Sequence, residues 1–412
     1  MRNNKTEKGE QSKVDKNYTK LWTKDFIVVS GVNFFLTLIF NLLIVTIGIY
    51  AVNEYNASTS QAGLAAGISI IGTLIGRIII GREIDRIGTK RTLMAGLILF
   101  TLTTLLYFVD FGLLFLLITR FVNGFTLGIA VTACGTIVAQ IIPDSRKGEG
   151  IGYFSMSTTL STAIGPFIGI YMSQNSSFQM IFALCLILGL FSLAVAFFVK
   201  APLLIRPAAS EDAKGVKLSQ FIEPKAVPIA IITLAIAFCY SSILSFINFY
   251  ASEINLVEAA SFFFLVYAIS VLLSRPITGR LLDSKGANFV MYPAFLLLAA
   301  GLLLLSAANT SATLLLSAAL IGLGFGNMQS CTQAIAVKLT PPHRMGLATS
   351  TFFIFLDIGI GFGPYILGFI IPVTGFRSMY VILSIFALAT SALYYFLHGR
   401  KKLAKSAAAT VS

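Results

Sequence analysis

The chain has 412 residues, of which 56% are hydrophobic and only 11% charged, and its mean hydropathy is +0.86. A soluble domain of this composition would expose large apolar patches, so the soluble classes are excluded. The formal net charge of +13 raises the possibility of a nucleic-acid partner. The basic residues, however, lie between apolar segments, where they indicate membrane orientation instead.

The first elements in chain order are apolar segments that repeat from near the N-terminus to the end. A bilayer core of about 30 Å takes about 20 helical residues at about 1.5 Å per residue. The sequence therefore predicts an all-α polytopic membrane protein with twelve transmembrane helices. The segments lie at roughly 26–50, 62–81, 92–110, 113–141, 150–172, 178–200, 226–250, 259–281, 289–308, 311–337, 347–372 and 377–398.

Polar stretches divide the chain into domains. Residues 1–25 are polar and Lys-rich with no apolar centre, which predicts a disordered tail and no signal peptide. The link 201–225 separates a six-helix bundle at 26–200 from a second at 226–398, and 399–412 forms a C-terminal tail. Most of the 30 Lys and Arg residues lie in the tails and in alternate links. The positive-inside rule therefore predicts that both termini are cytoplasmic, in what we expect to be a bacterial plasma membrane.

An internal repeat relates the two predicted bundles. An offset of 198 residues brings Arg77 onto Arg275, Gly81 onto Gly279 and Asp85 onto Asp283, and it holds at many further Gly, Pro and Arg positions. The repeat predicts two pseudo-symmetric six-helix bundles around a central cavity, the architecture of alternating-access carriers.

Three motifs resemble those of the major facilitator superfamily, and of its twelve-helix drug:proton antiporter branch in particular. The stretch GREIDRIGTKR at 81–91 is similar to the family's G-x-x-x-D-R-x-G-R-K-x loop, RFVNG at 120–124 to its R-x-x-x-G, and GPFIG at 165–169 to its G-P-x-x-G. The resemblance covers residues 25–400. It implies a carrier driven by a proton gradient, with export favoured over import.

The first motif and its copy predict a cytoplasmic gating loop. Gly88 permits a tight turn, and Asp85 can face the positive N-terminus of a helix. The basic residues can reach carboxylates or lipid phosphates. A simple positive-inside anchor is the alternative, but it does not explain the acid. The predicted gating residues are Gly81, Arg82, Asp85, Arg86, Gly88, Lys90, Arg91, Gly279 and Asp283.

Two charged residues inside apolar segments are the candidates for proton coupling. Asp357 is the only acid well inside a segment, and apolar surroundings favour the neutral, protonated carboxyl. Arg120 would cost about 2.5–3.5 kcal/mol in hydrocarbon, so we expect it to be paired and to face the cavity. The resemblance implies a coupling role for it. A structural ion pair for Asp357 and an outer-headgroup position for Arg120 are the alternatives.

The third motif predicts a special fifth helix. Pro166 should interrupt or kink it, and Gly165 and Gly169 should allow a close approach to a partner helix. In the resembling antiporters this motif is associated with export, although close packing alone would also explain its small residues.

Polar and aromatic side chains predict a substrate cavity. Asn33, Thr37 and Asn41 share one helix face, where they either line a cavity or join helices by hydrogen bonds. A cavity lined by amides and aromatic rings suits amphipathic or weakly charged organic molecules. The candidates are Asn33, Thr37, Asn41, Asn123, Tyr240, Asn248, Asn327 and Gln329.

The four cysteines lie inside apolar runs without metal-ligand spacing, so no metal site is expected. With no nucleotide-binding loop or clustered catalytic set, the sequence predicts no cofactor and no enzyme. It predicts a monomeric proton-coupled exporter of small organic molecules, in contact with membrane lipids. The alternatives are a proton-symport importer of a sugar or organic acid and, from another class, a membrane receptor or lipid-modifying enzyme.

Overall fold

The computed structural model describes residues 20–201 and 220–400. Most of the predicted tails (1–25 and 399–412) and of the link 201–225 lie outside these ranges. Within them the regular secondary structure is helical, without strands. The main helices are α2 (Lys24–Tyr55), α3 (Thr59–Ile87), α4 (Thr89–Leu105), α5 (Leu113–Ile141), α6 (Lys147–Asn175), α7 (Phe178–Ala196), α8 (Val227–Glu253), α9 (Val257–Ser261), α10 (Phe263–Ser284), α11 (Ala287–Ser306), α12 (Ser311–Ile321), α13 (Asn327–Lys338) and α14 (Met345–Tyr394).

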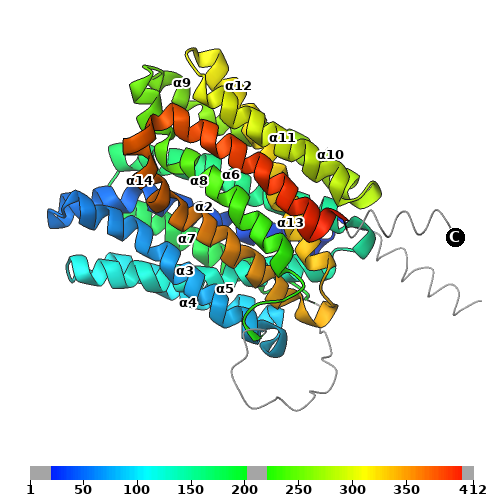
Figure 1. Cartoon of the computed structure of the whole chain (residues 1–412). Coiled ribbons are helices and arrows are strands. Elements are labelled where there is room, and N and C mark those ends of the chain that lie inside the picture. Colours follow the sequence, from blue (N-terminus) through cyan, green and yellow to red (C-terminus); the bar gives the residue numbers. More distant parts are fainter. Residues whose placement is uncertain (1–19, 202–219, 401–412) are drawn as a thin grey trace, which may run out of the picture.

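Ten helical segments of the described residues are long and apolar enough to cross a membrane. Helix α6 falls outside that set because its sequence is rich in Ser, Thr and Gly. Helix α14 counts once but contains two limbs, which meet at Gly375 with φ 75°. Figure 1 shows these limbs, brown and red, folding back on each other. With α6 and the second limb, the twelve predicted crossings are all present, and the predicted all-α fold is confirmed.

The helices form two halves. In Figure 1, α3, α4 and α5 of the first half lie at the bottom and α9 to α12 of the second half at the top, with helices of both halves between them. The halves contact each other mainly where α3 packs on α14 and where α6 packs on α10. These two contacts are equivalent under the 198-residue repeat, so the pseudo-symmetry of the sequence is also that of the packing.

Close helix contacts depend on small residues. A Cβ atom at Gly81 of α3 would overlap the side chain of Ser350 in α14, and one at Gly279 of α10 would lie 2.7 Å from the Cα of Glu149 in α6. Lipid provides little hydrophobic force between helices, so association relies on such close backbone packing. The paired glycines therefore set the distance between the halves.

The first motif is mostly helical, which corrects the prediction of a loop. Residues 81–87 form the end of α3, residues 89–91 begin α4, and Gly88 alone stands between them with φ 95°. Gly286 has φ 88° in the equivalent turn before α11. Both positions are left-handed, where a side chain would be strained, so the predicted role of Gly88 as a turn residue is confirmed.

The third motif does not interrupt its helix. Helix α6 continues through Pro166, so the predicted interruption is wrong. The predicted close approach is present, because a Cβ atom at Gly165 would lie 2.7 Å from the Cβ of Asn41 and one at Gly169 would lie 2.9 Å from Val45 Cγ2. Helix α6 thus lies tightly against α2.

Packing within the first half generates a stability prediction. We expect Gly124→Ala to destabilise the protein by about 1–3 kcal/mol, since its Cβ would overlap the backbone of Ser69. Gly31→Ala is the matched control, because its Cβ has no neighbour within 4 Å. Thermal unfolding in detergent should give a lower midpoint for the first variant only. Equal midpoints would contradict the predicted backbone overlap.

Candidate gate and coupling site

The first motif's acid binds the start of a helix in the other half. Asp85, in the last turn of α3, accepts hydrogen bonds from the backbone N–H groups of Gly346 (3.2 Å) and Leu347 (3.3 Å). These donors belong to the first turn of α14, where N–H groups have no partner within the helix. The helix dipole also favours a carboxylate there, by about 0.3–1 kcal/mol at exposed sites and up to about 2 kcal/mol when partly buried. The predicted contact of Asp85 with a helix N-terminus is therefore present.

The repeat of the motif makes the equivalent contact. Asp283 of α10 accepts from the N–H groups of Gly148 and Glu149, both at 2.8 Å, at the start of α6. The Nζ of Lys338 in α13 adds an ion pair at 2.6 Å. We call these two contacts the aspartate latches, and the side of the bundle that carries them the basic side. Although the repeat has fewer charges than the first motif, its latch has the shorter hydrogen bonds.

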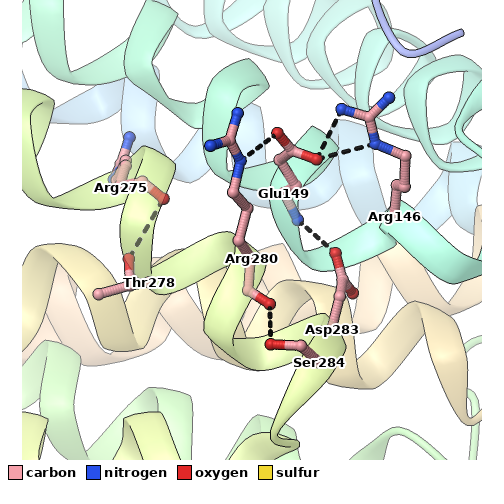
Figure 2. A network of polar contacts seen from close by, with 7 residues as sticks. All are labelled: Arg146, Glu149, Arg275, Thr278, Arg280, Asp283 and Ser284. Carbon is pink, nitrogen blue, oxygen red and sulfur yellow. Dashed lines mark hydrogen bonds and ion pairs between the residues drawn. The ribbon is translucent and has the colours of Figure 1, made fainter.

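A carboxylate reinforces the second latch. Figure 2 shows Glu149 between two arginines, with its backbone N–H donating to the Asp283 carboxylate. Its side chain pairs with Arg146 of the same half at 2.7 Å and with Arg280 of the other half at 2.9 Å. Only 4% of Glu149 is exposed. Glu149 was not among the predicted site residues. Its signal was its position directly after Gly148, which the 198-residue offset brings onto Gly346.

The basic residues of the first motif have ion-pair and hydrogen-bond partners within the first half of the protein. Arg82 and Arg86 pair with Glu83 of the same helix at 3.4 and 3.9 Å. Lys90 donates to the carbonyl of Phe197 at 3.1 Å, and Arg91 lies exposed. The anionic partners of Arg82 and Arg86 shown here therefore lie in their own helix, α3.

Deeper in the bundle, an ion pair joins the same two helices as the first latch. The Arg77 Nη1 of α3 lies 3.2 Å from Asp357 Oδ2 of α14, with side chains 9% and 15% exposed. The guanidinium also lies 4.4 Å from the ring centroid of Phe353. In addition, the Ser350 hydroxyl donates to the Arg77 carbonyl at 2.6 Å. Asp357 thus has a partner across the two halves, and that partner is Arg77 rather than Arg120.

Arg77 was not among the predicted site residues. Its signals were a charge inside an apolar segment and a spacing of four residues from Gly81 and eight from Asp85. That spacing places all three on one face of α3. The equivalent Arg275 of α10 is 1% exposed and donates to the Gly326 carbonyl at 3.1 Å.

Arg120 is buried, with 1% of its surface exposed, and it is paired as predicted. Its partners are the carbonyl groups of Ala65 and Ala66, the Ser69 hydroxyl at 2.8 Å and the Tyr107 hydroxyl at 3.4 Å. These bonds are with α3 and the end of the α4 segment, and none of these partners is an acid. Arg120 therefore ties α5 to its neighbours and does not contact Asp357.

The polar stripe of the first helix joins helices. Asn33 donates to the hydroxyl groups of Ser157 (2.8 Å) and Thr158 (3.1 Å), and the Thr37 hydroxyl lies 2.6 Å from that of Ser161. These partners belong to α6. Of the two alternatives that the sequence left open, interhelical hydrogen bonding is the one seen for these two residues. Asn41 donates to the Thr37 carbonyl of its own helix at 2.8 Å.

The remaining cavity candidates do not form one group. Asn123 binds Thr103 and Thr104, and Asn327 binds Ser274 and Thr278. Tyr240 is buried and stacks on Tyr267 and Phe325, with the second ring centroid at 4.1 Å. Asn248 is exposed and Gln329 half-buried. The hydrogen bonds of Asn123 and Asn327 thus join neighbouring helices.

The part of the chain that the structure describes has no cluster of metal-binding side chains. Residues 20–201 and 220–400 contain no group of three or more His, Cys, Asp or Glu side chains suited to a metal ion. The cysteines Cys134, Cys185, Cys239 and Cys331 are free thiols, all buried.

Relatives of the chain are transporters. A curated relative in Methanocaldococcus jannaschii, described as an uncharacterized MFS-type transporter, is 26% identical over 390 residues, which is 93% of this chain and 98% of the relative. A relative in Burkholderia pseudomallei with the same description is 25% identical over 374 residues, 87% of this chain and 88% of its own length.

Solved structures share the fold. The human organic anion transporter MFSD10 has a TM-score of 0.74 at 14% identity, covering 90% of this chain and 98% of its own. The fucose:proton symporter FucP of E. coli, solved in the outward conformation, has a TM-score of 0.71 at 16% identity, covering 92% and 99%. The family model of the Major Facilitator Superfamily matches residues 29–346 and 258–411. The chain is therefore a transporter that belongs to the Major Facilitator Superfamily.

Proposed function

We propose that the protein is a proton-coupled secondary transporter that exports small organic molecules by alternating access. The basic side is cytoplasmic in this proposal, because its links carry most of the Lys and Arg residues. Its partners are a small-molecule substrate, protons and the lipids of a plasma membrane, and it acts as a monomer.

The aspartate latches support an outward-facing assignment for this conformation. Both join the halves at the basic side, through α3 with α14 and through α10 with α6. Contacts that close one side favour the state in which the other side is open. The similarity to FucP in its outward conformation agrees with this assignment.

The observation that carries proton coupling is the Arg77–Asp357 ion pair at 3.2 Å. It joins the two halves between largely buried side chains, where charges interact strongly. A proton on Asp357 would cancel the attraction and loosen α3 from α14, so proton binding would change the balance between two conformations. Arg120 acts indirectly in this scheme, by holding α3, the helix that carries Arg77.

Export is favoured by the GPFIG motif, whose glycines bring α6 against α2. An importer that uses proton symport is the second candidate, since FucP is a fucose:proton symporter and the same ion pair could serve either direction. Accumulation assays separate the two. Cells that lack an exporter should retain more of its substrate, and cells that lack an importer should take up less.

The coupling proposal predicts that Asp357→Asn removes the dependence of transport on a pH gradient. The amide cannot exchange a proton near neutral pH, so the conformational balance should no longer respond to the gradient. The measurement is flux of dyes, antibiotics and metabolites in liposomes with an imposed gradient. We expect gradient-driven flux to fall at least about tenfold, which corresponds to about 1.4 kcal/mol.

Two further variants make that test decisive. Arg77→Gln/Asp357→Asn removes both charges, so it avoids leaving Arg77 buried without its acid. Asp110→Asn is the matched control, because Asp110 is exposed and accepts bonds from Tyr55 and Gly112 that an amide oxygen can also accept. Gradient-driven flux at the wild-type rate in both Asp357 variants would remove Asp357 from the mechanism.

The latches predict a shared effect of two distant aspartates. Asp85→Asn and Asp283→Asn should each lower the transport rate at least about threefold while expression is retained, because each weakens charge-assisted bonds to a helix N-terminus. Asp283→Asn also weakens the ion pair of Asp283 with Lys338. Initial rates in liposomes, normalised to reconstituted protein, measure this. Wild-type rates in both variants would exclude the latch role.

A further inference from the structure

The two latches have matching arginines but not matching acids. Under the 198-residue repeat, Arg146 corresponds to Arg344 and Arg280 corresponds to Arg82. At the second latch Glu149 binds both arginines. The residue equivalent to Glu149 is Leu347, so α14 has no carboxylate at the position where α6 carries Glu149.

A residue of the link between the halves supplies a carboxylate there. Glu223 pairs with Arg344 at 2.9 Å and is only 1% exposed. Its backbone N–H donates to the Thr351 hydroxyl of α14 at 2.9 Å. Burial of a carboxylate is costly unless it is paired and hydrogen-bonded. The Glu223 carboxylate has Arg344 at Oε2 and accepts a hydrogen bond at Oε1 from the backbone N–H of Lys225, at 3.2 Å. Glu223 is therefore held against the start of α14 by both its side chain and its backbone.

The same segment also reaches the first half. The guanidinium of Arg82, in α3, lies 5.1 Å from the ring centroid of Phe221, within the range of a cation–π contact. Glu83 does not make an equivalent connection, because the arginines with which it pairs, Arg82 and Arg86, share its helix. Phe221 and Glu223 together thus connect Arg82 of one half to Arg344 of the other, as Glu149 connects Arg280 to Arg146.

We propose that Glu223 completes the first latch, so that the end of the link at residues 220–225 is a working part of the gate. Glu223 is a positioning residue in this proposal. It holds the start of α14, and with it the N–H donors of Gly346 and Leu347, against Asp85. The inference rests on the alternating access of the proposed function. It does not depend on the direction of transport, the substrate or proton coupling.

The test measures separation of the halves directly. Nitroxide labels on cysteines introduced at Ser145 and Ser284 lie on exposed positions of opposite halves, and the native thiols are buried. Pulsed electron paramagnetic resonance then gives the ratio of long to short distances on the basic side. We expect Glu223→Gln to raise that ratio about tenfold, equivalent to about 1.4 kcal/mol. Glu223→Asp, which keeps the charge, should raise it less.

A double-mutant cycle separates the ion pair from general loss of packing. Arg344→Gln should raise the ratio as Glu223→Gln does, and the double variant should raise it little further, because both remove one interaction. Glu54→Gln is the control, because it removes an exposed charge near the C-terminal end of α2, away from both latches. This variant should leave the ratio unchanged. The proposal is overturned if folded Glu223→Gln protein keeps the wild-type distances, or if the two single effects add in full.

Discussion

The start of a helix has backbone N–H groups that need acceptors, and in this transporter two of those helices find them across the boundary between its halves. Asp85 accepts from the start of α14, and Asp283 accepts from the start of α6. The glycines at 81 and 279 allow the approach that brings each aspartate within reach. The ion pair of Arg77 with Asp357 joins the same two helices as the first of these contacts, α3 and α14.

Pseudo-symmetry of the backbone is combined with asymmetry of the charges. One latch uses Lys338 and Glu149, both on helices, whereas the other has Glu223 from the link. The ion pair inside the bundle is also one-sided, since Asp357 faces Arg77 while Arg275 binds a carbonyl group. The proton response proposed for Asp357 would act on only one of the two equivalent contacts, and it would therefore give the two halves different roles.

The sequence predicted the fold well because apolar runs, basic links and a constant repeat are each properties of the chain itself. It also predicted that Asp85 could face a helix N-terminus, since a simple basic anchor would not explain an acid at that position. It could not give the partner helix, which depends on three-dimensional packing. For the same reason it selected Arg120 and Asp357 as coupling candidates without giving the partner of Asp357, which is Arg77. Polar stripes such as Asn33 and Thr37 were ambiguous, because cavity walls and helix contacts use the same amides and hydroxyl groups.

Each latch has a side chain on one face and main chain on the other. Substitution can remove the acceptor oxygens of Asp85 or Asp283, but the donors of Gly346, Leu347, Gly148 and Glu149 are peptide groups that every residue except proline retains. Evolution can therefore vary the residues at these helix starts, as Glu149 and Leu347 differ here, without losing the donors. A comparison of sequences would therefore detect the aspartates of these contacts but not their backbone donors.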